Sequence, residues 1–94
     1  MRKVKQTVAF KRDFKRETKG PNRKFLLESF ETLIRTLAND ELLEVRHRDH
    51  ALGGEWRDHR DCHLRPDLVL IYRKPDDDSL HLVRLGSHSE LFKK

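Results

Sequence analysis

The sequence predicts an α+β domain in which a helix hairpin covers one face of a four-stranded sheet. Three observations predict it: a helical repeat of apolar residues in the front part of the chain, short β-prone runs from Glu55 onward, and a helix-start signal near the end. The chain has 94 residues and is 35% hydrophobic, which is enough for one modest core. We therefore expect a single domain over residues 1–94.

The first two elements should be a short strand and a helix. The stretch MRKVKQ supplies a strand through Val4. Thr7 is the expected N-cap of the helix, which has Phe10 and Phe14 one turn apart on the side that faces the core.

A second helix should follow the tetrapeptide KGPN. Gly20 suits the left-handed position after a helix, Pro21 prevents continuation and Asn22 can cap the next helix. Two helices should therefore form a hairpin. The second helix has an apolar stripe with helical spacing that we assign to the core: Phe25, Leu26, Phe30, Leu33, Ile34 and Leu37.

From Glu55 onward the pattern is that of short strands. Side chains on a strand alternate between two faces, so the run from Trp56 to Leu64 should have one core face and one polar face. The core face is predicted to hold Trp56, Cys62 and Leu64, and the polar face Arg57, His59, Asp61 and His63. LRP is an expected turn and DLVLIY is the most β-prone run, so residues 56–64 and 67–73 should form a hairpin.

The end of the chain should form a last strand and a short helix. KPDDDS is an expected turn, and LHLVRLG, residues 80–86, is the last predicted strand. In SHSELF, Ser87 and Glu90 have the spacing of a capping box, which predicts a terminal helix.

The distribution of charge points to a polyanionic partner. The chain has 21 Lys and Arg against 16 Asp and Glu, and residues 1–24 hold ten of the basic residues but only two of the acidic ones. Such a positive field attracts RNA, DNA and ribosomes. A lysine-rich, solvated helix explains the same composition.

We expect a cytoplasmic protein that does not enter a membrane. Cys62 is the only cysteine, so no internal disulfide can form. No apolar run resembles a signal peptide or approaches the length needed to span a bilayer.

A group of titratable side chains suggests proton-transfer chemistry. The hairpin should bring His63 and Asp67 together across LRP, and His50 should enter from the preceding loop. Arg84 and His88 can join them from the last strand and the terminal helix, whose N-terminus should favour a phosphate. Cleavage of RNA by its own 2′-hydroxyl needs a base, an acid and a cation, and this set contains all three.

Other readings of the histidines compete with this one. Strand histidines are more often solvated than catalytic, and we assign His47, His59 and His81 to that class. His59, Cys62 and His63 could bind a metal, but period two places Cys62 on the opposite face and no second cysteine provides zinc spacing. The same geometry argues against Cys62 as a nucleophile, so we expect no metal and no cofactor.

The segment from Arg48 to Phe92 resembles a known family. It contains RDHALGGEWRDHRDCHLRPDLVLIYR followed by LHLVRLGSHSELF, and it is similar to the YafQ-type branch of the RelE/ParE toxin superfamily. The resemblance implies a RelE-like fold and a metal-independent endoribonuclease, the toxin of a type II toxin-antitoxin system. Such mRNA interferases cleave messenger RNA in the ribosomal decoding site, which inhibits translation, and a cognate antitoxin protein holds them inactive.

The resemblance also implies which residues exchange protons with the RNA. The positions that match the family's catalytic residues are His50, His63, Asp67 and His88. His88 is the implied general acid that protonates the leaving oxygen, and either His50 or Asp67 is the implied base.

The remaining implied roles concern contacts with the RNA. His63 would orient or stabilise the phosphate, Arg84 would neutralise it, and Phe92 would stack on a base. Leu68 and Ala51 depart from the family's pattern, in which these positions are often aromatic and proline. The resemblance therefore implies no codon preference for this protein.

Ribosome binding would give the basic front of the chain a role. The residues expected to contact ribosomal RNA are Lys11, Arg12, Lys15 and Arg16. Two other functions stay open: a ParE-like toxin that poisons DNA gyrase without cutting RNA, and a nucleic-acid-binding module without catalysis. ParE-like toxins lack a comparable histidine set, which favours the ribonuclease.

Overall fold

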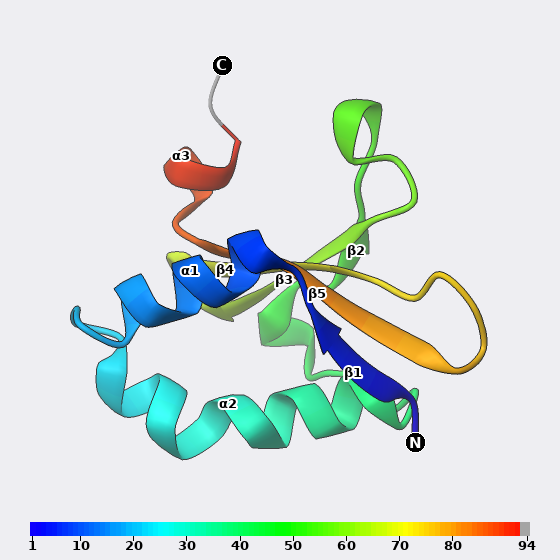
Figure 1. Ribbon diagram of the computed structural model, residues 1–94, viewed down its shortest axis with the longest axis horizontal. Coiled ribbons are helices and arrows are strands. Elements are labelled where there is room, and N and C mark those ends of the chain that lie inside the picture. The colour runs from blue at the N-terminus through cyan, green and yellow to red at the C-terminus, as the bar shows by residue number, and fades with distance from the viewer. Residues whose placement is uncertain (93–94) are drawn as a thin grey trace.

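The computed structural model describes residues 1–92 and has the predicted order of elements (Figure 1). The helices and longer strands are β1 (Lys3–Gln6), α1 (Val8–Glu17), α2 (Arg23–Ala38), β3 (Arg60–Arg65), β4 (Leu68–Arg73), β5 (Ser79–Gly86) and α3 (His88–Leu91). Between α2 and β3 lie two single 3₁₀ turns, η1 (Val45–His47) and η2 (Gly54–Trp56), and a two-residue strand, β2 (His50–Ala51). The α+β prediction is confirmed.

The strands form one sheet in the order β1-β5-β4-β3-β2, with β1 parallel to β5 and the other neighbours antiparallel. This is one strand more than the four that we expected. The additional strand is β2, in which His50 pairs with Asp61 and Ala51 with Arg60. Two residues are too few to produce a period-two pattern, so the sequence could not predict this strand.

The helix hairpin packs on one side of the sheet and forms the main core with it (Figure 1). The predicted stripe on α2 is confirmed, since Leu26, Ile34 and Leu37 are buried and the other members are half-buried. The rings of Phe10 and Phe14 from α1 and of Phe30 from α2 lie with centroids 5.1 to 6.0 Å apart. These contacts fix the hairpin against the sheet.

The structure confirms one predicted helix cap and contradicts two features of the hairpin turn. Thr7 Oγ1 accepts a hydrogen bond from the Phe10 N–H at 2.9 Å, as expected of an N-cap. Asn22 does not cap α2, because its side-chain amide donates to Glu17 instead. Among the glycines of residues 1–92, only Gly54 has a positive φ, so Gly20 is not left-handed and α1 ends without a glycine cap.

The side of the sheet away from α1 and α2 is the open face. It has a smaller apolar cluster of Val69, Ile71 and Leu91, against which Leu52, Trp56, Val83 and Phe92 pack. β4 is buried from Leu68 to Tyr72 because it has apolar neighbours on both faces. This explains why DLVLIY has a nearly continuous apolar pattern.

Trp56 does not share a face with Cys62, as we had expected. β3 begins at Arg60, and Trp56 belongs to the η2 turn before it. Asp58, with φ of 71°, interrupts the extended backbone between them. Trp56 therefore packs on the open face, because strand parity holds only where a strand exists.

No helix within residues 1–92 is both long and apolar enough to cross a lipid bilayer.

Candidate active site on the open face

Strand β3 divides its side chains between the two faces as the sequence predicted. Cys62 and Leu64 are buried in the main core, whereas Asp61 and His63 pair with Ile71 and Val69, which belong to the open-face cluster. Burial raises the pKa of the Cys62 thiol. A protonated, buried thiol on the helix-covered side cannot serve as the nucleophile of a site on the open face.

His50 sits on a segment that is anchored to the sheet by its neighbour Asp49. Asp49 Oδ1 accepts hydrogen bonds from the Tyr72 hydroxyl at 2.7 Å and from Arg60 Nε at 3.0 Å. Burial, together with this bond to Asp49, raises the pKa of Tyr72, so the hydroxyl stays a donor. The His50 side chain itself is 53% exposed. A fixed backbone and an accessible ring suit a group that acts on a bound substrate.

Asp61 is a site residue that strand parity predicts on the polar face but that was not among the predicted catalytic residues. It is 2% exposed, and its Oδ1 lies 3.1 Å from His50 Nδ1. Burial raises the pKa of Asp61, while the nearby His50, His63 and His88 act in the opposite direction. The parity shared with His63 was the signal that could have identified it.

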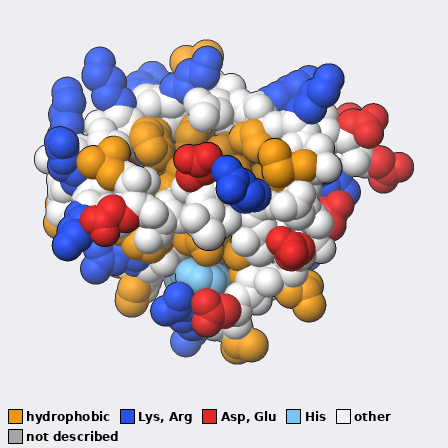
Figure 2. Space-filling view, turned by 90° about the horizontal axis from the view of Figure 1, so that it is seen from below, with side chains coloured by type: hydrophobic (Ala, Val, Ile, Leu, Met, Phe, Trp, Pro, Cys, Tyr) orange, Lys and Arg blue, Asp and Glu red, His pale blue; other side chains and the backbone are white. Residues whose placement is uncertain are grey.

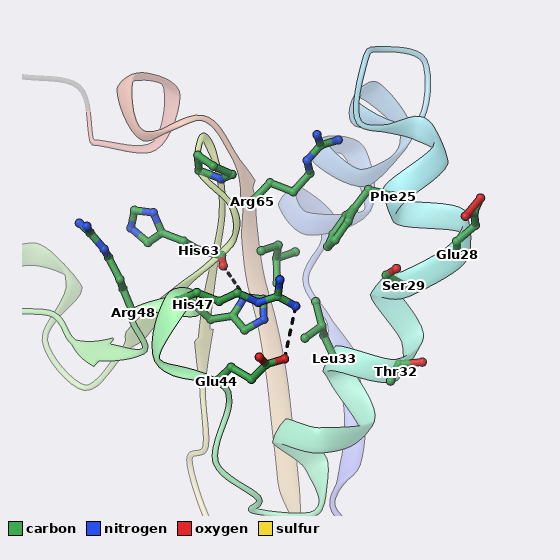
Figure 3. A pocket seen from close by; sticks show the side chains of 13 residues that line it. Phe25, Glu28, Ser29, Thr32, Leu33, Glu44, His47, Arg48, His63 and Arg65 are labelled. Atoms are coloured by element: carbon green, nitrogen blue, oxygen red, sulfur yellow. Dashed lines mark hydrogen bonds and ion pairs between the residues drawn. The ribbon is translucent and has the colours of Figure 1, made fainter.

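His63 is held by a buried histidine that we had expected to be solvated. His47 is 5% exposed, and its Nδ1 lies 2.7 Å from the backbone oxygen of His63 (Figure 3). His47 belongs to the η1 turn, which packs against β3. Its assignment to the solvated class was wrong, because a 3₁₀ turn has no period that marks its inner side.

A groove of about 940 Å³ lies beside His63, between α2 and the segments η1 and β3 (Figure 3). Phe25 and Leu33 of α2 form part of the wall of the groove. At the upper end of the groove in this view, the side chains of Arg48 and Arg65 lie on either side of His63. The Arg65 guanidinium lies 5.8 Å from the centre of the Phe25 ring. The groove thus combines cations with an aromatic ring, both of which bind single-stranded RNA.

Asp67 contacts the terminal helix and not His63. The hairpin pairs His63 with Val69, and a register shift follows between His63 and Arg65. Asp67 Oδ1 instead accepts from the backbone N–H of His88 at a long 3.4 Å. Within residues 1–92, no hydrogen bond or ion pair joins Asp67 to His63. The register shift at the end of β3 lies between His63 and the turn that holds Asp67.

The capping box at the start of α3 is confirmed. The Glu90 N–H donates to Ser87 Oγ at 3.2 Å, and the Ser87 N–H donates to Glu90 Oε1 at 2.8 Å. These bonds fix the backbone on which His88 and Phe92 lie, with ring centroids 4.8 Å apart. α3 has only four residues, so the positions of His88 and Phe92 matter more than its small dipole.

Arg84 is held by a buried carboxylate on α1. Its Nε and Nη2 donate to Asp13 at 2.6 and 3.3 Å, and Nη1 takes part in neither bond. Asp13, 2% exposed, also accepts from Arg16 Nη1 at 2.9 Å and from the Leu85 N–H at 3.0 Å. Burial raises the pKa of Asp13, but the hydrogen bonds from Arg84, Leu85 and Arg16 outweigh burial and lower it.

The basic residues of α1 divide into two groups. Lys11, Arg12 and Lys15 are exposed, and Figure 2 shows Lys and Arg side chains gathered at the end of the molecule where the helix hairpin turns. Arg16 differs, because it bonds Asp13 and donates to the Leu85 carbonyl at 2.9 Å. The structure thus gives Arg16 a role in packing that the charge count did not indicate.

The remaining histidines lie outside this group. His59 is half-buried and its ring meets that of Trp56 edge-on, with centroids 5.3 Å apart. His81 is half-buried near the start of β5, opposite Lys5 and Arg73. Within residues 1–92, no three His, Cys, Asp or Glu side chains have an arrangement that could hold a metal ion.

The open face therefore concentrates proton donors and acceptors from separate segments of the chain. β2 supplies His50, β3 supplies Asp61 and His63, the β3–β4 turn supplies Asp67, and α3 supplies His88. Imidazole and carboxylate groups can act as acid and base on one substrate.

Comparisons with known proteins identify close relatives along the whole chain. The model of a family described as the bacterial toxin YafQ of type II toxin-antitoxin systems matches residues 2–93. A Haemophilus influenzae protein named "Putative toxin YafQ" is 37% identical over 91 residues, covering 94% of this chain and 89% of the relative. A protein named mRNA interferase toxin YafQ, from Escherichia coli strain B, is 30% identical over 91 residues, covering 95% and 98%.

The fold is also similar to that of a solved toxin in complex with its antitoxin. The crystal structure of the Escherichia coli DinJ-YafQ complex contains a chain that is 32% identical, with a TM-score of 0.80. The match covers 98% of this chain and 99% of that one.

Proposed function

This chain belongs to the YafQ family of bacterial type II toxins, and we propose that it cleaves messenger RNA inside the decoding site of the ribosome. It is an endoribonuclease, since two of its Escherichia coli relatives are named mRNA interferases. The observation that supports the proposal most directly is the convergence of His50, His63 and His88 with Asp67 on the open face. RNA provides its own nucleophile, so such a site needs only proton transfer and charge stabilisation.

The reaction proposed is attack of a ribose 2′-hydroxyl on the adjacent phosphate. His50 or Asp67 removes the proton of the 2′-hydroxyl, and the resulting oxyanion forms a bond with phosphorus. The bond from phosphorus to the 5′-oxygen of the next nucleotide then breaks, and His88 donates a proton to that oxygen. The products are a 2′,3′-cyclic phosphate and a free 5′-hydroxyl.

Three further side chains are proposed to hold the RNA. His63 orients the phosphate, and Arg84 neutralises its charge through the Nη1 group that does not bond Asp13. Phe92, beside His88, stacks on a base. The departures at Leu68 and Ala51 concern these substrate contacts and leave the proton donors and acceptors in place.

The proposed protein partner is an antitoxin of the same operon. The solved relative is bound to the antitoxin DinJ. We propose that an antitoxin covers this chain in the same way and blocks its access to RNA.

The function is tested by mapping the ends of a defined message after incubation with the purified toxin. One sample contains translating ribosomes, and the other contains the same message as free RNA. We expect cuts only with ribosomes, each leaving a cyclic phosphate and a 5′-hydroxyl. Absence of cleavage in both samples, by a preparation that still binds ribosomes, would favour a gyrase poison or a non-catalytic module.

The exposed basic side of α1 should contribute to ribosome binding. We expect the triple substitution Lys11→Gln, Arg12→Gln and Lys15→Gln to weaken binding to empty ribosomes, because it removes three contacts with phosphate charge. The slope of log affinity against log salt should also become shallower. Sedimentation of ribosomes at several salt concentrations measures both.

A matched control removes the same charge from another helix. Arg23→Gln, Lys24→Gln and Arg35→Gln replace three exposed basic residues of α2. Equal weakening by the two triple variants would contradict a specific role of α1, since it would reflect only net charge. Arg16 is left unchanged in both, because its bonds to Asp13 and Leu85 stabilise the fold.

A further inference from the structure

Asp61 is a buried carboxylate that the fold does not use. Its residue is 2% exposed, its Oδ1 is buried, and that oxygen makes no hydrogen bond within the described residues. Its neighbour across the hairpin is the apolar Ile71 of β4. A carboxylate buried in this way destabilises a protein, so the needs of folding do not explain it.

The ring nitrogen Nδ1 of His50 forms an ion-pair contact with Asp61. Nδ1 lies 2.6 Å from the backbone oxygen of Arg48 and 3.1 Å from Asp61 Oδ1. A carbonyl and an ionised carboxylate can only accept hydrogen bonds, so Nδ1 must be the donor. The neutral ring therefore has its proton on Nδ1 and its lone pair on Nε2, in a side chain that is 53% exposed.

We propose that Asp61 is a positioning residue that makes His50 the general base of the reaction. The Arg48 carbonyl keeps the proton on Nδ1 in the neutral ring, and Asp61 stabilises the imidazolium that forms when Nε2 takes the proton of the 2′-hydroxyl. A small rotation of the ring moves the Nδ1–H from Arg48 to the carboxylate at that moment. The proposal rests on the proposed ribonuclease function, and it selects His50 over Asp67 as the base.

The charges around Asp61 are suited to this role. His50 faces it from β2, His63 from its own strand and His88 from α3, whereas Asp49 is a negative group that acts on it in the opposite direction. Ile71, which pairs with it in β4, adds no charge. Burial raises the pKa of Asp61 and the three histidines oppose this rise, so a new positive charge on His50 would stabilise the carboxylate further.

The substitution Asp61→Asn tests the proposal with readouts that a purely structural residue would not give. At saturating toxin on message-programmed ribosomes, the single-turnover rate should fall about 10- to 100-fold. The toxin concentration that gives half the maximal rate should stay the same. The acidic limb of the pH–rate profile should move to lower pH, because the base has lost a neighbouring negative charge.

The thermal unfolding midpoint of the Asp61→Asn variant should be unchanged or higher, since the substitution removes a buried charge whose Oδ1 accepts no hydrogen bond from residues 1–92. Asp58→Asn is the matched control: this residue is exposed and has φ of 71°, a conformation that asparagine tolerates. The control should cleave at the wild-type rate.

An unchanged single-turnover rate would overturn the proposal. A lower rate that accompanies a lower unfolding midpoint, with the same pH–rate profile, would overturn it as well, because it would show a structural role. Nitrogen-15 spectra of the histidine rings test the hydrogen bonding in the wild-type protein without RNA, and a neutral His50 ring protonated at Nε2 would contradict the proposal. Failure of the wild type to cleave would refute the proposed function. The spectra would then still show whether the His50 ring carries its proton on Nδ1, as the proposal requires.

Discussion

The variant His88→Ala should cleave ribosome-bound messenger RNA about 10²- to 10⁴-fold more slowly than the wild type, because it lacks the group that protonates the leaving oxygen. Without that proton, an alkoxide must leave the phosphate, which is the costly part of the reaction. His88 is exposed on a short helix, where its ring lies beside that of Phe92, and it is not one of the buried core residues. The variant should therefore fold and bind ribosomes like the wild type.

A chemically modified message distinguishes the role of His88 as general acid from any other role of this side chain. Sulfur in place of the 5′-oxygen at the cut site gives a thiolate, which leaves without protonation. We expect this message to restore most of the rate of His88→Ala, and His81→Ala should match the wild type on both messages, since His81 lies at the other end of β5. A His88→Ala variant that is equally slow on both messages would contradict the assignment of His88 as the acid.

The second large effect is on stability. Replacing Asp13 with asparagine should lower the free energy of unfolding at pH 7 by about 2–3 kcal/mol, since it removes the buried charge that two guanidinium groups and one N–H bond. Arg84 and Arg16 are partly exposed and can turn to water, which keeps the loss from being larger. Urea unfolding followed by circular dichroism measures this loss of unfolding free energy, with Asp77→Asn, a substitution in an exposed loop, as the control.

The same carboxylate predicts how stability depends on pH. Because the pKa of Asp13 in the fold lies below its ordinary value of 3.8, its ionised form stabilises the protein at any pH above that value. This contribution is lost as the pH falls through the lower pKa of the folded state. The difference in stability between wild type and Asp13→Asn should thus be constant near neutral pH and shrink at acidic pH. A difference that persists unchanged in acid would show that packing, and not charge, is lost.

Strong local patterns explain what could be predicted about the fold. The apolar spacing in α2, the threonine cap of α1 and the serine cap of α3 depend on neighbours within one or two turns, and all three are present. β2 and the displaced Trp56 could not be predicted. Their conformations depend on pairing with β3 and on the left-handed residue Asp58, which no period reveals.

The candidate site shows a similar division. His50, His63, Asp67 and His88 were selected from residue type, turn position and family resemblance, and the fold places them on or beside the open face. The buried residues that support them were not selected. Asp61 sits next to His50, Asp13 holds Arg84 and His47 bonds the backbone of His63.

The sequence by itself determined the order of the helices and longer strands, the apolar sides of the helices and of β3, and the set of side chains capable of proton transfer. These properties follow from residue type and short-range spacing. Only the tertiary structure decided which of those side chains face one another and which charges are buried. A carboxylate such as Asp61 or Asp13 looks the same in sequence whether water or a histidine or arginine surrounds it, because its environment comes from strands and helices distant along the chain.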